Sequence, residues 1–453
     1  MANCCCHTAG RADPAQRPVG CYPYQVRIGL FTDSYHPASN GVVVIVDATR
    51  RQLEELGHEV YIFAPDGGVL THKQPHDPHV IRMPAFQYDM QLSLFFPPWL
   101  LAKVARLHLD VIEFFTPAQL GLTSVLAARL THAALVGKHS TDTYEFSKNY
   151  KAMAISYVFA GLLAPTIVKP TPHRLATYLR LYLTPQPRPK GERWSQHLVA
   201  GLMAMLYASC DAVIAVSDKS ADQLTGFADR IGETLPICVL PDGIDVLAPP
   251  QPGEVETLRS RWGIEPDDEV VVNFGRMAEE KNQVLLINMM PRLVKQRPHV
   301  KLVLAGDYVF RGRLEALAAA SPVSDRIIFT GPYERRELGA ICAISQVFAF
   351  PSLTDTQGIV LNEAAGLGLP IVMCDQHLND VFVEGQNGLL ANNDPTDFAK
   401  AVARLLADDQ LRTAFSERGR QLAAQFTERH QAEKLAALFE QLPNLRGPKC
   451  ASR

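Results

Sequence analysis

The chain has 453 residues, of which 47% are hydrophobic and 20% are charged, and its formal net charge is −3. This composition excludes a disordered or collagen-like protein, and the length predicts about two or three domains. The small net charge gives no indication of a nucleic-acid partner, so none is expected.

The cysteines and the N-terminus indicate the compartment in which the protein works. The 9 cysteines include the adjacent residues Cys4, Cys5 and Cys6, which cannot bridge one another in normal geometry. A disulfide framework is not expected, which favours a reducing compartment. Residues 1–24 lack the apolar core of a signal peptide and are predicted to be a disordered leader. Since no uncharged apolar run reaches the ~20 residues of a spanning helix, we expect a cytoplasmic protein that contacts membranes only peripherally.

The first half of the chain alternates apolar strands with helical segments. Residues 26–31 are predicted to form a buried strand, a helix follows over 42–56 and ends before Gly57, and residues 59–64 form the next strand. Strand–helix–strand in so short a stretch is typical of a parallel α/β sheet. The same strand pattern recurs at 111–115, 134–136 and 212–216.

A second alternating series begins near Pro236. Its predicted strands are residues 238–240, 270–274, 300–304, 326–329, 347–350 and 370–373. The two series predict two doubly wound, Rossmann-like α/β domains, over residues 25–220 and 221–420. In the remaining stretch, 421–453, residues 421–443 are predicted to form one long amphipathic helix.

The segment 151–210 interrupts the first series and differs from it in charge. It contains 7 Lys or Arg residues and a single acidic residue, Glu192, so it carries +6 whereas the rest of the chain sums to −9. Aromatic residues such as Tyr157, Phe159 and Trp194 lie between these charges. The composition is typical of an interfacial helix on anionic lipid, and equally of a solvated basic face on ordinary helices.

Several nucleotide and metal motifs do not occur in the sequence. The loop after the first strand has Gly41 at its far end but no Gly-x-Gly-x-x-Gly. The sequence also has no Gly-x-x-x-x-Gly-Lys-Ser/Thr phosphate loop, no His-Glu-x-x-His and no pair of Cys-x-x-Cys clusters. These findings weigh against a dehydrogenase, a kinase and a zinc hydrolase.

Two cations follow the predicted strand 270–274. Arg276 and Lys281 lie between this strand and a helix that begins near residue 282. Open α/β sheets bind ligands at the carboxyl ends of their strands, and two cations there suit a diphosphate. Surface charges on a loop are the structural alternative.

A polar turn and an apolar helix follow the predicted strand 347–350. Gly358 precedes the helix and lets a ligand approach the backbone, where the first free N–H groups favour an anion. Asp355 lies before the helix and Glu363 lies one turn inside it. The structural alternatives are a helix cap for Asp355 and a solvated carboxylate for Glu363.

Together these pieces resemble the family 4 glycosyltransferases, which have the two-domain GT-B fold with a cleft between the domains. The resemblance covers nearly all of residues 26–440, and each motif is common but the ordered set is specific. The motifs are Arg27-Ile-Gly-Leu-Phe-Thr-Asp-Ser-Tyr-His-Pro, Asn40-Gly41-Val42, Gly57-His58-Glu59-Val60, Ala215-Val216-Ser217, Pro241-Asp242-Gly243-Ile244-Asp245, Gly275-Arg276, Glu280-Lys281-Asn282 and the turn and helix at 351–370.

The resemblance implies roles for individual residues. The family has two glutamates with seven residues between them, and here the first is Asp355 and the second is Glu363. Asp355 is expected to contact the donor sugar as a catalytic residue and Glu363 to hold the ribose. His139 matches a family histidine beside the transferred sugar, although a lone histidine is more often structural. The full set implied to bind the donor is Gly41, Arg276, Lys281, Asp355, Thr356, Gln357, Gly358, Ile359 and Glu363.

The resemblance also implies the reaction and the partners. A hexose would move from a nucleotide diphosphate sugar, UDP-sugar favoured and GDP-sugar possible, to an acceptor hydroxyl with retention and without a metal or other cofactor. The donor would bind the C-terminal domain, the acceptor the N-terminal domain, and the C-terminal helix would pack back toward the N-terminal domain. The opening motif and residues 115–121 look most like members that glycosylate membrane lipids, so a glycerolipid at an anionic membrane is expected. The alternatives are a nucleotide-sugar epimerase of the same fold, a transferase with a soluble acceptor, a dehydrogenase and an inactive binding protein.

Overall fold

The structure of this chain is a computed structural model, and it describes most of the two predicted domains. The described residues are 25–36, 41–66, 77–84, 98–140, 142, 144, 168, 171–183, 192–245, 247–378 and 381–445. The predicted leader 1–24 lies outside them, as does part of the basic segment 151–210.

The N-terminal domain is built on a parallel sheet with the strand order β3-β2-β1-β4-β5-β6-β7. Apolar side chains that alternate along each strand fill one core on either face of this sheet. Its strands are β1 (Arg27–Phe31), β2 (Glu59–Asp66), β3 (Val80–Pro84), β4 (Val111–Phe114), β5 (Ala134–His139), β6 (Ala212–Ala215) and β7 (Ile237–Val239). Its helices include α1 (Gly41–Glu55), α3 (Pro98–Leu107), α4 (Gln119–Thr131), α7 (Pro172–Leu183), α8 (Trp194–Tyr207) and α9 (Asp218–Asp229).

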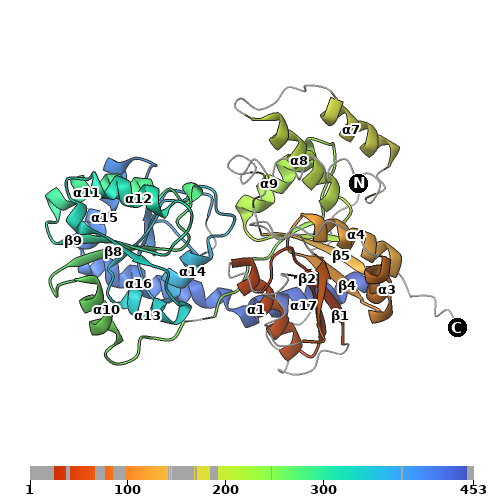
Figure 1. The fold of residues 1–453 in the computed structure, drawn as a ribbon, viewed down its shortest axis with the longest axis horizontal. Helices are drawn as coiled ribbons and strands as arrows, with labels where there is room; N and C mark the ends of the chain where they lie inside the picture. The colour runs from red at the N-terminus through yellow and green to blue at the C-terminus, as the bar shows by residue number, and fades with distance from the viewer. Residues whose placement is uncertain are drawn as a thin grey trace.

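The C-terminal domain has a second parallel sheet, with the order β10-β9-β8-β11-β12-β13 and a core on each face. Its strands are β8 (Glu269–Phe274), β9 (Val300–Ala305), β10 (Ile327–Gly331), β11 (Val347–Phe350), β12 (Ile371–Met373) and β13 (Gly388–Leu390). Its helices include α10 (Glu254–Trp262), α11 (Gln283–Gln296), α12 (Arg311–Ala319), α13 (Leu338–Ala343), α14 (Ile359–Gly366), α15 (Pro395–Ala407) and α16 (Asp409–Ala423). Figure 1 shows the two domains as separate lobes.

The prediction of two doubly wound α/β domains is confirmed. In each sheet the strand order reverses once, between β1 and β4 in the first and between β8 and β11 in the second. The loops that leave the two strands at such a switch point diverge, which opens a crevice where α/β proteins bind ligands. The loops after β8 and β11 therefore lie where a ligand is expected.

One predicted strand belongs to the other domain. Residues 238–240 were assigned to the second series, but β7 (Ile237–Val239) pairs with β6 in the first sheet. The division between the sheets thus lies after Val239 and not at residue 220. β7 is a short edge strand, and Val239 is 44% exposed, so its pattern carries little information about its neighbours.

The last helix returns to the N-terminal domain. Helix α17 (Glu428–Leu445) buries Ala436 and Phe439 in the same cluster as Ile28 of β1, and in Figure 1 it lies beside α1. The predicted start at residue 421 is wrong, because α16 and a short 3₁₀ turn end at Phe426 and Thr427 is extended. The helical pattern breaks where the chain leaves one domain for the other.

Candidate active site

Two loops at the switch point of the C-terminal sheet form the candidate site. The loop after β8 carries Arg276 and Lys281, and the loop after β11 carries residues 351–358. At the edge of the sheet, a Cβ on Gly306 would lie 1.9 Å from the carbonyl oxygen of Gly275. Glycine at position 306 therefore allows the chains leaving β8 and β9 to touch, which holds the loop after β8 against the sheet.

An ion pair between Lys281 and Asp355 joins the two loops. Their side chains are 23% and 15% exposed, and Lys281 Nζ contacts Asp355 Oδ1. Burial would raise the pKa of Asp355, but the charge and hydrogen bond of Lys281, with smaller contributions from Ser352 and from the charge of Lys219, outweigh burial and hold that pKa below its usual value. Asp355 is therefore ionised at neutral pH. Among the described residues nothing donates a hydrogen bond to its other oxygen, Oδ2, which leaves an acceptor for a ligand hydroxyl.

Arg276 stays accessible beside this pair. Its side chain is 41% exposed, its Cζ atom lies 5.2 Å from the centre of the Tyr308 ring, and Nη2 lies 3.7 Å from Glu280 Oε1. Stacking on an aromatic ring orients a guanidinium and leaves its N–H groups for a ligand. Arg276 can therefore bind an anion that also approaches Lys281.

Glu363 and Asn362 lie inside α14 beside a small cavity. Ile244 and Asp245 also line this cavity, and they belong to the segment between β7 and α10, residues 240–253, which is called the linker below. Burial raises the pKa of Glu363, although Arg335 Nε, 3.2 Å from Glu363 Oε1, opposes the shift. Asn362 is 4% exposed, and within the described part of the chain neither atom of its amide group has a hydrogen-bond partner. A largely buried carboxylate next to an unsatisfied amide can bind ligand hydroxyls. Asn362 and Arg335 were not predicted from the sequence.

Helix α14 begins directly after the second loop. Gly358 is its N-cap, with φ 74° and ψ 61°, and none of the described side chains caps the helix. The N–H groups of the first turn have no acceptor within the helix, so this end favours an anion. Ile359, the first helical residue, packs against the apolar cluster of the N-terminal domain. The helix end thus lies at the boundary between the domains.

The side chains of Thr356 and Gln357 point to the N-terminal half of the chain. Thr356 Oγ1 donates to the Ser140 carbonyl oxygen at 2.9 Å, and the Ser217 hydroxyl donates to the Thr356 carbonyl oxygen. Gln357 accepts from the Asp242 N–H and donates to the Asp242 carbonyl oxygen, both at 2.9 Å. These residues, predicted to bind the donor, therefore also fix the turn to the opposite domain and to the linker.

His139 lies in the core of the N-terminal domain. It is 0% exposed, with Nδ1 3.1 Å from the Tyr207 hydroxyl and Nε2 2.8 Å from Gln223 Oε1, and burial lowers its pKa. Its ring nitrogens are engaged by Tyr207 and Gln223, and a catalytic role for His139 stays a prediction. Gly41 is the first residue of α1 and is exposed. A Cβ added at this position would lie more than 4 Å from every described atom.

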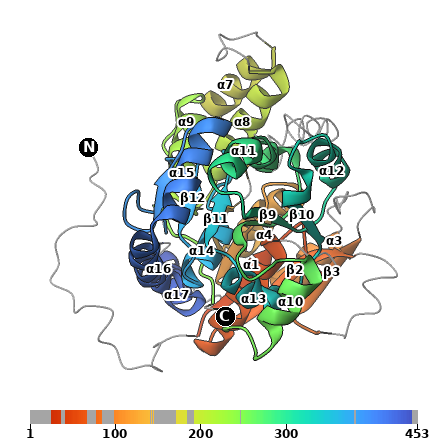
Figure 2. The same cartoon turned by 90° about the vertical axis from the view of Figure 1, so that its left-hand side faces the viewer.

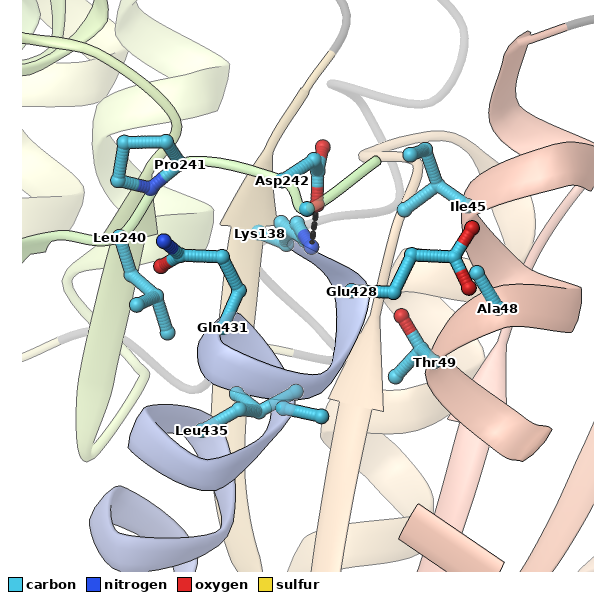
Figure 3. A pocket seen from close by; sticks show the side chains of 12 residues that line it. Ile45, Ala48, Thr49, Lys138, Leu240, Pro241, Asp242, Glu428, Gln431 and Leu435 are labelled. Atoms are coloured by element: carbon cyan, nitrogen blue, oxygen red, sulfur yellow. Dashed lines mark hydrogen bonds and ion pairs between the residues drawn. The ribbon is translucent and has the colours of Figure 1, made fainter. Parts of the chain in front are cut away.

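A cavity with both apolar and charged lining residues lies between α1, α17 and the linker (Figure 3). Lys138, Asp242, Glu428 and Gln431 line it, and the Lys138 ammonium pairs with the Asp242 carboxylate. Glu113 on β4 is 0% exposed, and burial raises its pKa to about 7, with the charge of Lys138 opposing the shift. The linker is therefore anchored on a buried ionic group.

Within the described ranges, no group of three or more His, Cys, Asp or Glu side chains could hold a metal ion. None of the helices in the same ranges combines the length and the apolar character needed to cross a membrane.

Known proteins resemble the chain over both domains. The family model "Glycosyltransferase Family 4" matches residues 39–246, and "Glycosyl transferases group 1" matches residues 254–422. An alpha-monoglucosyldiacylglycerol synthase of Streptococcus pneumoniae is 24% identical over 84% of this chain and 78% of its own length. The enzyme of the same name from Acholeplasma laidlawii is 25% identical over 81% of this chain and 85% of its own. A structure of Anabaena HepE in complex with UDP has a TM-score of 0.67 and 18% identity, and the match covers 92% of this chain and all of that one.

Proposed function

Because the chain belongs to the family 4 glycosyltransferases, we propose that it transfers a hexose from a nucleotide diphosphate sugar to a hydroxyl group of a membrane glycerolipid. The proposed donor is a UDP-sugar, with a GDP-sugar as the other option, and the anomeric configuration is retained. The names of the two synthases support transfer and not the epimerase alternative.

The observation that carries this proposal is the convergence of Arg276, Lys281, Asp355 and the start of α14 at one switch point. When the bond from the sugar to the diphosphate breaks, negative charge develops on the leaving phosphate and positive charge at the anomeric carbon. Arg276, Lys281 and the helix N–H groups stabilise the phosphate, and Asp355 holds sugar hydroxyls. Glu363 binds the ribose. The leaving phosphate accepts the acceptor's proton, so the proposed transfer uses no metal and no separate base.

Helix α7 supports a lipid acceptor. It lies at the outer edge of the N-terminal domain beyond α8 in both Figure 1 and Figure 2. Its Leu179 and Leu183 are 45% and 77% exposed, and Arg180 is exposed next to Leu179. Apolar and basic side chains side by side suit an anionic membrane surface. Tyr157 and Phe159 of the basic segment lie outside the described residues.

The test offers labelled UDP-glucose, UDP-galactose and GDP-mannose to the protein with vesicles that contain diacylglycerol. We expect a glycolipid whose anomeric configuration, read by NMR, matches that of the donor, and no product from Asp355→Asn. Label that appears only on a water-soluble acceptor such as inositol 3-phosphate would exclude the lipid. Interconversion of the donor sugar without transfer would establish the epimerase instead.

A further inference from the structure

Lys219, near the start of α9 in the N-terminal domain, reaches the loops of the C-terminal domain. Its Nζ atom donates to the carbonyl oxygens of Leu353 and Asp355, at 2.8 and 2.9 Å, and lies 2.5 Å from Asp375 Oδ2. Leu353 and Asp355 belong to the loop after β11, and Asp375 follows β12. An ammonium group has three N–H donors, and here all three are used on the opposite domain.

The position of Lys219 within its own helix does not explain its presence. It is the second residue of α9, where the helix dipole disfavours a positive charge. Ser217 already caps this helix by accepting a hydrogen bond from the Ser220 N–H. A cation at this place costs stability locally, and its contacts across the domain boundary offset that cost.

The charges around the loop balance only when Lys219 is in place. Asp355 and Asp375 supply two carboxylates, and Lys281 and Lys219 supply two ammonium groups. The Asp375 side chain is 4% exposed, so its charge is poorly screened by water. If the domains separate, Lys219 leaves, and the two carboxylates then face Lys281 and Arg276, and the charge of Arg276 is already shared with Glu280. An excess of negative charge beside the donor loop opposes the formation of an anionic leaving group.

We propose that Lys219 is a positioning residue that completes the donor site only when the two domains are closed. It fixes the backbone of the loop that carries Asp355, neutralises Asp375, and so links cleavage of the donor to closure. The inference rests on the proposed function and names a residue of the N-terminal domain as part of the donor side.

Kinetics with UDP-glucose and diacylglycerol vesicles test this role. We expect Lys219→Met to lower kcat by about 10- to 100-fold, because charge-assisted hydrogen bonds to the loop are lost. The Kd of free UDP, measured by calorimetry, should change by less than about threefold, since the diphosphate contacts of Arg276 and Lys281 persist. Lys219→Arg keeps the charge and should recover part of kcat. Lys301→Met is the matched control, because Lys301 also binds a carbonyl oxygen and an aspartate, Asp268, but lies away from the loop.

Two results overturn the inference. One is a Lys219→Met variant with the kcat of the wild type, and the other is a loss of UDP affinity as large as the loss of kcat. Asp375→Asn provides a second variant and should lower kcat in the same direction.

Small-angle X-ray scattering separates this inference from the proposed function. Lys219→Met should have a larger radius of gyration than wild type and Lys301→Met, because the contact between the domains is weakened. If the wild type transfers no hexose, the proposed function fails, and the scattering result alone then decides whether Lys219 holds the domains together. An unchanged radius of gyration overturns that role.

Discussion

The ion pair of Lys281 and Asp355 can be removed in a way that separates stability from catalysis. Both side chains are mostly buried, at 23% and 15% exposure. Removing one partner of a buried pair costs about 3–5 kcal/mol, because the other charge is left without compensation. The charge of Lys219 still acts on Asp355, so we expect a loss of only about 2–3 kcal/mol in the free energy of unfolding for Lys281→Met.

The double variant Lys281→Met with Asp355→Asn leaves no unpaired charge at the pair itself. We therefore expect it to be more stable than Lys281→Met, with a coupling energy of about 2 kcal/mol between the two positions. Transfer should not recover, because the groups proposed to stabilise the leaving phosphate and to hold the sugar are both gone. We expect kcat to be at least about 100-fold lower than that of the wild type in each single variant and in the double variant.

Two quantities are measured on the same preparations. Urea unfolding followed by circular dichroism gives the stability, and release of UDP from the donor gives the transfer activity. Lys301→Met serves as the control, because it breaks a comparable ion pair with Asp268 at a distance from the site. Strictly additive losses of stability would show that the pair is not coupled. A double variant that transfers hexose like the wild type would refute the placement of the donor.

Three further results are expected. Glu363→Ala should weaken UDP binding by about 1–3 kcal/mol, because the largely buried carboxylate proposed to accept from the ribose hydroxyls is removed. The control Glu417→Ala, at an exposed position, should leave UDP binding unchanged, and equal UDP affinity in both variants would exclude the ribose role. Flotation with anionic vesicles should weaken in high salt and in Arg174→Glu with Arg180→Glu, and a protein that never floats would exclude membrane docking. The pKa of Glu113 is about 7 in the folded state and 4.5 ordinarily, so the folded state binds one proton more than the unfolded state between these two values. The folded state therefore loses stability as the pH rises from 4.5 to about 7. Glu113→Gln should therefore gain about 3 kcal/mol relative to wild type between pH 5 and pH 8 in urea unfolding, and a difference that is independent of pH would contradict this.

The fold was predictable because each half of the chain repeats the same local pattern. Apolar runs that end in polar loops, separated by helical periodicity, require parallel strands with helices between them. The apolar pattern gave the wrong domain for β7, which is a short edge strand with few buried residues. It also gave the wrong start for α17, because it did not predict the turn before Glu428. Both errors lie where the chain passes between the domains, because a local pattern contains no information about which core a segment joins.

The candidate site was also predictable in part. Arg276, Lys281 and the turn before α14 follow strand ends, and strand ends can be recognised locally. The contacts of Thr356 and Gln357 with the opposite half could not be predicted, since they depend on how the domains meet. Lys219 was missed for the same reason. Its surroundings in the sequence are those of an ordinary helix start, and its partners lie more than 130 residues away.

The return of α17 has a consequence for biosynthesis. The apolar cluster of α1 and β1 is completed by Ala436, Phe439 and Leu442, which are synthesised after the whole C-terminal domain. The N-terminal domain therefore leaves the ribosome before the C-terminal domain but completes its core only after it, and it exposes an apolar surface to chaperones until α17 has been synthesised. Loss of the residues after Thr427, by proteolysis or by a premature stop codon, would damage the domain that is synthesised first of the two.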